Sequence, residues 1–269
     1  MMKIGLIGTG NMGGAILKGY VAAHPGLGRN CYVYDVNSAA AQTLSGETNA
    51  VVAESIEDLT KISDLVIIAV KPFHYDDVLP EIVSCDLTGK TIISIAAGVT
   101  IDRLERSLGS ETAIVRIMPN TPAAVQCGMT AVWKNKNVNP SDFQEVMQLL
   151  HSFGKALEFE DEEQVHAVIG AGGSSPAYAY MFIDAIAKAS AQEGMRYEDA
   201  LLFSAQAVMG AAKMVMESGS DPTALRIAVC SPNGTTIEAV QTLQNNGFEA
   251  CVAEAVQAAA KRSREMSNE

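Results

Sequence analysis

Cysteine, histidine and positive charge are scarce in this sequence, and each scarcity excludes a class of protein. The five cysteines are odd in number and scattered, with no C-x-x-C pair, so the sequence signals neither a disulfide framework nor a zinc site. The four histidines stand apart, without the spacing of metal ligands. We therefore expect no metal, and we expect most of the cysteines to be small core residues.

Acidic residues outnumber basic residues by 31 to 19, which gives a formal net charge of -12. Long-range repulsion would oppose encounters with nucleic acid or with an anionic membrane, so we expect neither partner. No apolar run reaches the roughly 18 to 20 residues of a membrane span, and the first residues have a strand pattern rather than that of a cleavable leader. We expect a cytoplasmic protein, in which an anionic substrate needs a local positive site.

A glycine-rich turn follows the first apolar segment. Residues 4–13 read I-G-L-I-G-T-G-N-M-G, so Gly8-x-Gly10-x-x-Gly13 comes directly after a buried-strand pattern. Gly8 suits the tight turn, Gly10 lets the backbone approach a pyrophosphate, and Gly13 lets the helix lie close to the strand. A helix that starts near Asn11 would point its first N–H groups at the phosphates.

The sequence around this turn favours dinucleotide binding over a glycine turn that only packs. An apolar helical pattern follows the turn, and Asp35 closes the next apolar run about twenty residues on, where an acidic side chain binds the cofactor ribose. The residues predicted here to bind a dinucleotide are Gly8, Thr9, Gly10, Asn11, Met12, Gly13 and Asp35.

Short β-rich runs alternate with helical stretches over residues 1–160. This alternation predicts an α/β fold, a Rossmann-type, doubly wound and mostly parallel sheet with right-handed crossovers. The chain of 269 residues is long enough for a second domain. We predict strands over residues 4–8, 31–35, 65–70, 91–95, 113–117, 128–134 and 156–159.

Residues 161–269 are rich in Ala, Met and Glu and have apolar positions at helical spacing. They predict an all-helical second domain, joined to the first by a continuous helix near residues 155–165. We expect the Met-rich stretch 209–216 to pack in the core or at a subunit interface; the alternative is a flexible ligand surface.

Three predicted strand ends suit a nicotinamide site, because doubly wound sheets bind ligands at the carboxyl ends of their strands. After the strand predicted over residues 65–70, Lys71 lies where the cofactor ribose would be. After the strand 91–95 come small residues that admit a flat ring. After the strand 113–117, Asn120 stands between two prolines, and this rigid turn can aim its amide. Each has the alternative of an ordinary strand exit. The predicted cofactor contacts are Ala69, Val70, Lys71, Pro72, Ala96, Ala97 and Asn120.

In the helical domain, two turns rich in glycine and hydroxyl residues precede helical patterns, over residues 170–178 and 230–238. In the second turn Pro232 starts the turn, and Gly234-Thr235-Thr236 opens a helix with free N–H groups and two hydroxyls. Such a helix N-terminus binds a carboxylate without lysine or arginine. The alternative is a well-capped helix without a ligand.

The strings GLIGTGNMG, AVKP, SIAAGV, RIMPNTPA, GSSPAYAYMFI and CSPNGTTIEAV occur in this order. With them the chain resembles the pyrroline-5-carboxylate reductases over nearly its whole length, and the last three strings are specific to that family. The resemblance implies reduction of 1-pyrroline-5-carboxylate to L-proline by hydride from NAD(P)H. It also implies that the helical domain dimerises, that the active site forms between the cofactor domain and the dimerised helical domain, and that the dimer often belongs to a larger ring.

Two residues depart from the family pattern. Asn233 stands at the first glycine of the family's Ser-Pro-Gly-Gly, and Asn tolerates left-handed dihedrals, so the turn can survive. Asp35 is acidic where NADPH enzymes must accept a 2′-phosphate, and it usually favours the ribose diol of NADH. The expected cofactor is NADP(H), with NAD(H) as the alternative.

A neutral imine is a poor hydride acceptor, so the substrate ring nitrogen should be protonated when hydride arrives. We expect Thr236 to hydrogen-bond that nitrogen, directly or through a water, while N–H groups of residues 234–236 and the Ser231 hydroxyl hold the carboxylate. Glu162 matches an acidic family position and is a candidate substrate contact; the alternative is a solvated face of the acidic run 160–163. The predicted substrate-binding residues are Ser174, Ser175, Ser231, Asn233, Gly234, Thr235, Thr236 and Glu162.

Two rival functions remain. A β-hydroxyacid dehydrogenase of the 6-phosphogluconate type shares the first domain and a glycine-rich segment, but it takes the alcohol proton with a lysine, and residues 174–178 contain none. A dinucleotide-sensing protein without turnover would bind cofactor and have no carboxylate site.

Overall fold

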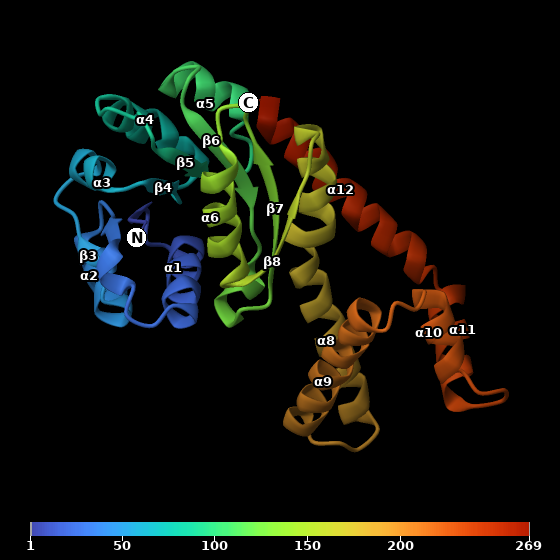
Figure 1. Cartoon of the computed structure of the whole chain (residues 1–269). Helices are drawn as coiled ribbons and strands as arrows, with labels where there is room; N and C mark the ends of the chain where they lie inside the picture. Colours follow the sequence, from blue (N-terminus) through green and yellow to red (C-terminus); the bar gives the residue numbers. More distant parts are fainter. Residues whose placement is uncertain (1, 269) are drawn as a thin grey trace. The chain divides into compact units, whose positions relative to one another are not determined.

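The computed structural model describes residues 2–268, which divide into two compact units (Figure 1). The first unit runs to Ser174 and takes up the chain again from Ala259, and the second is Ser175–Ala258. The boundary predicted from the sequence lies between residues 160 and 161. In the structure the segment 161–174 and the end of the last helix belong to the first unit and not to the second.

A sheet of eight strands forms the centre of the first unit, in the order β3-β2-β1-β4-β5-β6-β7-β8. Every neighbouring pair is parallel except β6 with β7, which is antiparallel. The predicted α/β fold is therefore confirmed. The strands are β1 (Ile4–Ile7), β2 (Cys31–Tyr34), β3 (Val51–Val52), β4 (Leu65–Ile68), β5 (Thr91–Ser94), β6 (Ala113–Met118), β7 (Gly128–Lys134) and β8 (Gly154–Glu158).

Helices cover both faces of this sheet, and each face has its own apolar core. Along β4, Leu65 and Ile67 belong to one core, whereas Val66 and Ile68 belong to the other, because side chains alternate along a strand. Strands buried on both faces are apolar throughout, which is why they were readable in the sequence. The covering helices are α1 (Asn11–Ala23), α2 (Ser38–Thr48), α3 (Ile56–Ile62), α4 (Tyr75–Val83), α5 (Ile101–Leu108) and α6 (Pro140–His151).

The prediction of a continuous helix near residues 155–165 is wrong. The chain there forms β8, whose backbone pairs in parallel with β7, and then a short 3-10 turn, Glu162–Gln164. The strand predicted over residues 156–159 is confirmed as β8, which pairing with β7 holds in place. After the turn come α7 (Val165–Val168) and a π-helix, Ile169–Gly173.

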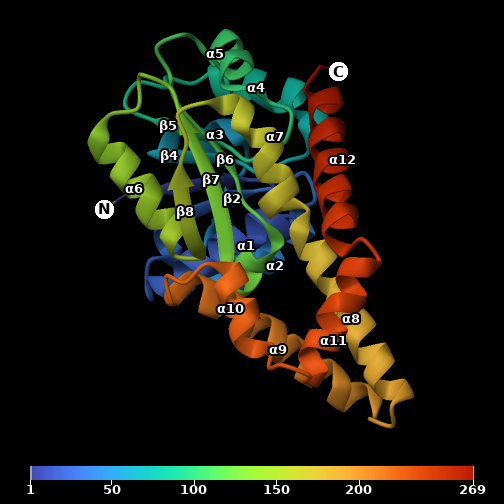
Figure 2. The ribbon, with the colours of Figure 1, turned by 90° about the vertical axis from the view of Figure 1, so that its right-hand side faces the viewer.

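The second unit is all-helical, as predicted. α8 and α9 lie side by side (Figure 2), and the Tyr197 hydroxyl at the start of α9 donates to Asp184 of α8 at 2.8 Å. The helices are α8 (Ser175–Gln192), α9 (Tyr197–Glu217), α10 (Pro222–Val229), α11 (Thr235–Asn245) and the first half of α12 (Phe248–Asn268).

Large apolar side chains are exposed on this helical unit. Met209 and Met216 of the Met-rich stretch are about three-fifths exposed, and Phe203 is 70% exposed. Monomeric proteins rarely leave so many large apolar side chains in water, and an exposed apolar surface of this kind is typical of an interaction site. The Met-rich stretch is therefore no part of a core within this chain.

The burial of the cysteines differs from the expectation drawn from composition. Of the cysteines, Cys31 and Cys85 are buried while Cys127 and Cys251 are exposed, so the expectation that most of them lie in the core is wrong. Within residues 2–268, no group of three or more His, Cys, Asp and Glu side chains is placed to hold a metal ion. Over the same residues, no helix is both long enough and apolar enough to cross a membrane.

Candidate cofactor and substrate sites

The glycine turn between β1 and α1 has the geometry that each glycine was predicted to need. Gly8 has φ of +97°, and a Cβ there would lie 2.8 Å from the Ala69 carbonyl. A Cβ at Gly13 would lie 2.2 Å from the Gly8 carbonyl oxygen, so only glycine lets the helix approach the turn this closely.

The start of α1 is open above this turn. Gly10 is the N-cap and provides no side-chain cap, and a Cβ built on it meets no atom within 4 Å. Asn11 and Met12 are the first helical residues, so their N–H groups have no partner inside the helix. This end of the helix is open to an anion, and pyrophosphate binding here stays a prediction.

Asp35 lies just after β2 and anchors the glycine turn. Its Oδ2 accepts hydrogen bonds from the Thr9 N–H at 2.7 Å and the Thr9 hydroxyl at 2.9 Å, and its Oδ1 accepts one from the Asn37 N–H at 2.9 Å. A carboxylate can accept about four hydrogen bonds, so these three donors leave room for a ribose hydroxyl. The residue therefore has a structural role that the sequence did not reveal, and its contact with the ribose stays a prediction.

A pocket of about 120 Å³ adjoins Asp35 at the carboxyl ends of the strands. Val36, Val70 and Val78 give it apolar walls that suit a flat base, and the acidic Asp77 and Glu81 of α4 also line it. Carboxylates at this point oppose an additional phosphate on the ribose. Among the other predicted contacts after β4, Ala69 packs against the glycine turn, whereas Lys71 is exposed ahead of the 3-10 turn that begins at Pro72.

A second pocket, of about 230 Å³, lies at the end of β5. Ala97 lines it together with Ser174, so one predicted cofactor residue and one predicted substrate residue of the first unit are brought together. Ala96 is only 4% exposed and belongs to the core, so its side chain offers almost no surface to a cofactor. The remaining lining includes Gly98, Met118, Ser263 and Met266.

The end of α12 forms one wall of this second pocket, which sequence reasoning missed. Gly98 has φ of +84°, and a Cβ there would be 3.2 Å from the Met266 carbonyl oxygen. Buried His166 of α7 shares a hydrogen bond of 2.8 Å between its Nδ1 and the Ser263 hydroxyl, and burial lowers the pKa of this histidine. Both contacts hold the last turns of α12 on the first unit.

Asn120 was predicted to aim its amide at the cofactor. In the structure, both the oxygen and the nitrogen of that amide form hydrogen bonds with protein backbone. Its Oδ1 accepts from the Met129 N–H at 2.9 Å, and its Nδ2 donates to the Gly172 carbonyl at 3.0 Å. Met129 lies in β7 and Gly172 in the π-helix. The amide therefore joins the end of β6 to the segment that leads to Ser174.

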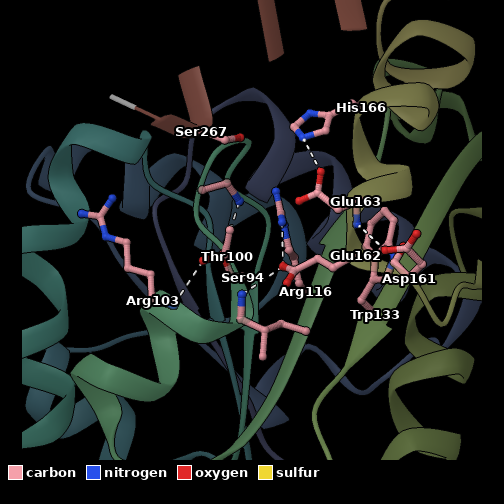
Figure 3. Close-up of polar contacts among 12 residues, drawn as sticks. Ser94, Thr100, Arg103, Arg116, Trp133, Asp161, Glu162, Glu163, His166 and Ser267 are labelled. Atoms are coloured by element: carbon pink, nitrogen blue, oxygen red, sulfur yellow. Dashed lines mark hydrogen bonds and ion pairs between the residues drawn. The ribbon is translucent and has the colours of Figure 1, made fainter. Parts of the chain in front are cut away.

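Glu162 makes contacts other than the predicted ones. Its Oε1 accepts from Nη1 of Arg116 at 2.6 Å and from the Ile101 N–H at 2.9 Å (Figure 3). Arg116 is 2% exposed, and its guanidinium lies 6.0 Å from the centre of the Trp133 ring. Glu162 is thus neither part of a solvated acidic face nor, through this oxygen, a substrate contact; it compensates a buried cation and caps the first turn of α5.

The turn before α11 lies in the second unit and keeps most of its predicted features. Asn233 has φ of +58°, so it adopts the left-handed conformation that the substitution for glycine requires. The Gly234 N–H donates to the Ser231 carbonyl at 3.0 Å, so this N–H closes the turn and is not a carboxylate donor. Ser175, another predicted substrate-binding residue, lies outside this turn and is the first residue of α8.

The N-terminus of α11 is open. Gly234 is its N-cap without a side-chain cap, and a Cβ there would lie 2.3 Å from the Ser231 hydroxyl oxygen, which places that hydroxyl beside the start of the helix. The N–H groups of Thr235 and Thr236 have no acceptor within the helix, since they belong to its first turn. With the Thr236 hydroxyl they form a group of donors suited to a carboxylate.

The glycine turn, the acidic end of β2 and the small residues after β5 define an NAD(P)-dependent oxidoreductase. Residues 3–98 match the family model described as NADP oxidoreductase, coenzyme F420-dependent. Residues 162–266 match the family model described as pyrroline-5-carboxylate reductase dimerisation.

Similarity to known proteins extends over the whole chain. The pyrroline-5-carboxylate reductase of Escherichia coli is 46% identical over 265 residues, 98% of each chain, and that of Methanosarcina acetivorans is 35% identical over 264 residues, 98% of this chain and 97% of that one. The crystal structure of Plasmodium falciparum pyrroline carboxylate reductase with NADP bound has a TM-score of 0.88 at 32% identity, covering 99% of this chain and 98% of that one. The chain belongs to the pyrroline-5-carboxylate reductase family.

The Arg116–Glu162 pair generates a stability prediction. Glu162→Gln keeps the shape of the side chain but leaves the buried guanidinium without its counter-charge, so the free energy of unfolding should fall by about 1 to 3 kcal/mol. Chemical denaturation measures it, with Glu163→Gln as control, because that neighbouring side chain is 84% exposed. Equal effects of the two substitutions would contradict the assigned role of the pair.

Asp35 generates a prediction about cofactor choice. Asp35→Ser should lower activity with both cofactors because Thr9 loses its anchor, yet it should raise the ratio of kcat/KM with NADPH to that with NADH by roughly 5- to 30-fold, since a carboxylate facing the 2′-phosphate is removed. Asp76→Asn, on α4 but outside the pocket, is the control. An unchanged ratio in Asp35→Ser would show that Asp35 does not face the ribose.

Proposed function

We propose that this protein reduces 1-pyrroline-5-carboxylate to L-proline with hydride from NADPH or NADH, the last step of proline biosynthesis. The observation that carries the proposal is the extent of the similarity: the E. coli relative matches over 265 residues, so the match takes in both the glycine turn and the Ser231–Thr236 turn. The NADP-bound Plasmodium falciparum structure supports NADP(H) as cofactor.

The residues of the first unit would hold the cofactor. The open start of α1 suits the pyrophosphate, and the pocket beside Asp35 suits the adenosine end. The small Ala97 and Gly98 leave space at the end of β5 for a flat nicotinamide ring, from which the bound cofactor supplies hydride.

The residues of the Ser231–Thr236 turn would hold the substrate. The N–H groups of Thr235 and Thr236 and the Ser231 hydroxyl bind the carboxylate, and the Thr236 hydroxyl hydrogen-bonds the ring nitrogen. That nitrogen is protonated before the reaction, so hydride addition to the imine carbon gives the neutral secondary amine. A threonine hydroxyl is a weak acid, so its role is to position the ring rather than to donate a proton.

The assembly that we propose is a homodimer or a larger homo-oligomer. It is supported by the dimerisation match over residues 162–266 and by the apolar side chains exposed on α9. A cytoplasmic location and the absence of nucleic-acid and membrane partners remain predictions from charge and composition.

The first prediction from this proposal is the activity itself. Purified protein given 1-pyrroline-5-carboxylate should consume NADPH or NADH and form an equal amount of proline, measured by cofactor absorbance and amino-acid analysis. A β-hydroxyacid substrate such as 6-phosphogluconate should give no cofactor reduction with NADP⁺. Absence of proline with both reduced cofactors would refute the proposed activity.

The second prediction separates substrate binding from cofactor binding. Thr236→Ala should lower kcat/KM for 1-pyrroline-5-carboxylate roughly 5- to 150-fold, because one hydroxyl contact to a charged group is lost, while NADPH affinity stays nearly constant. Gly234→Val should lower it further, since a side chain there meets Ser231. Thr242→Ala, whose hydroxyl only bonds within α11, is the matched control. An unchanged kcat/KM in Thr236→Ala would place the substrate elsewhere.

A further inference from the structure

We propose that Asn120 is a positioning residue that supplies the hydrogen bond which Pro176 cannot give to the Gly172 carbonyl, and so fixes the π-helix that carries Ser174. The inference deepens the proposed function and rests on it for its kinetic test. It changes the role predicted for Asn120, from a cofactor contact to a residue that acts through the backbone of another segment.

The need for this bond arises in the sequence. In an α-helix the carbonyl of each residue accepts from the N–H four residues later. The residue four positions after Gly172 is Pro176, which has no N–H, and its ring crowds the carbonyl four residues before it. A regular helix through this segment would leave the Gly172 carbonyl without a backbone donor.

The backbone before Pro176 forms a helical turn that is wider than an α-helical turn. Over Ile169–Gly173 the chain is a π-helix, and the Ser174 N–H donates to the Ile169 carbonyl at 2.7 Å, five residues back. Such turns are rare and cluster at functional sites. Widening the turn accommodates the proline but does not supply a donor for the Gly172 carbonyl.

Asn120 supplies that donor from a distant part of the chain. Its Nδ2 lies 3.0 Å from the Gly172 carbonyl oxygen, while its Oδ1 accepts from the Met129 N–H at 2.9 Å. The two contacts fix the orientation of the amide, because a flipped amide would face donor with donor and acceptor with acceptor. Pro119 and Pro122 flank the residue's turn and restrict its backbone.

The two hydrogen bonds of the Asn120 amide, to Gly172 and to Met129, form a clamp. This clamp acts on Ser174, at the edge of the pocket that Ala97 also lines. Ser174 follows the clamped Gly172 by two residues and lines that pocket with Met118. The Met118 methyl group would lie 3.5 Å from a Cβ on Gly173, so the segment packs against the end of β6 as well. Hydride transfer depends steeply on geometry, and a misplacement of about 1 Å can cost roughly 100-fold in rate. Releasing the clamp should therefore lower kcat rather than cofactor affinity.

The test compares wild type, Asn120→Asp, Pro176→Ala and the double variant. Asn120→Asp keeps an acceptor for the Met129 N–H but turns a carboxylate oxygen towards the Gly172 carbonyl, and kcat should fall about 10- to 100-fold with the Kd of NADPH changed less than about threefold. Pro176→Ala restores an N–H four residues after Gly172. Alone it should keep nearly full activity, and in the double variant it should recover most of the lost kcat.

Two controls separate loss of the clamp from a general effect of altering an amide side chain. Asn246→Asp removes an amide-to-carbonyl bond of the same kind, to the Thr242 carbonyl near the end of α11, and should leave kcat unchanged. Asn120→Ala removes the donor without adding charge, and Pro176→Ala should rescue it too. A loss of cofactor affinity that parallels the loss of kcat, or a double variant no better than Asn120→Asp, would overturn the proposal.

Thermal unfolding of the same four proteins gives a readout that does not need turnover. Asn120→Asp should lower Tm, and Pro176→Ala should restore most of that loss, so the two substitutions are coupled. Independent effects on Tm would overturn the clamp. Wild-type protein without turnover of 1-pyrroline-5-carboxylate would refute the proposed function but leave this coupling to be measured.

Discussion

The buried guanidinium of Arg116 is the constraint on which the functional edge of the first unit depends. A cation that is 2% exposed must be compensated, and Glu162 provides the counter-charge at 2.6 Å. The same carboxylate oxygen caps Ile101 at the start of α5, and the Trp133 indole next to the guanidinium donates to the Asp161 carbonyl at 2.8 Å. The segment that follows β8 is thereby held beside β6 and β7, and from there the chain enters the π-helix that leads to Ser174.

The two proposed anion sites, at the starts of α1 and α11, bind anions in the same way, without using basic side chains. The start of α1 and the start of α11 each have a glycine as N-cap, with no side-chain cap, so backbone N–H groups and the helix dipole face outward. Such donors carry no formal charge and bind a pyrophosphate or a carboxylate only at close range. A protein with a net charge of -12 can then bind anionic ligands without a large basic surface.

The sequence predicted those features that short segments determine. Strands buried on both faces have continuous apolar runs, and the glycine turn is set by residues within six positions of one another. Features that depend on distant partners were missed or misassigned. The two exposed residues of β3 have no strand pattern of their own, and the continuous helix predicted near residues 155–165 takes no account of the pairing of β8 with β7. Asn120 was recognised as an amide held by two prolines, but its partner Gly172 is 52 residues away. Arg116 is one polar residue in an otherwise apolar strand, and its partner Glu162 is 46 residues away.

The proposed reaction is direct hydride transfer from the nicotinamide to the imine carbon of a substrate held by its carboxylate. Reduction can be followed with NADPH that carries deuterium at the transferred position of its nicotinamide C4, by mass spectrometry and NMR of the product. We expect proline with one deuterium on the ring carbon that was the imine carbon, and the same labelling at a lower rate in Thr236→Ala. Proline without deuterium, or no labelled product under conditions in which the cofactor binds, would contradict it.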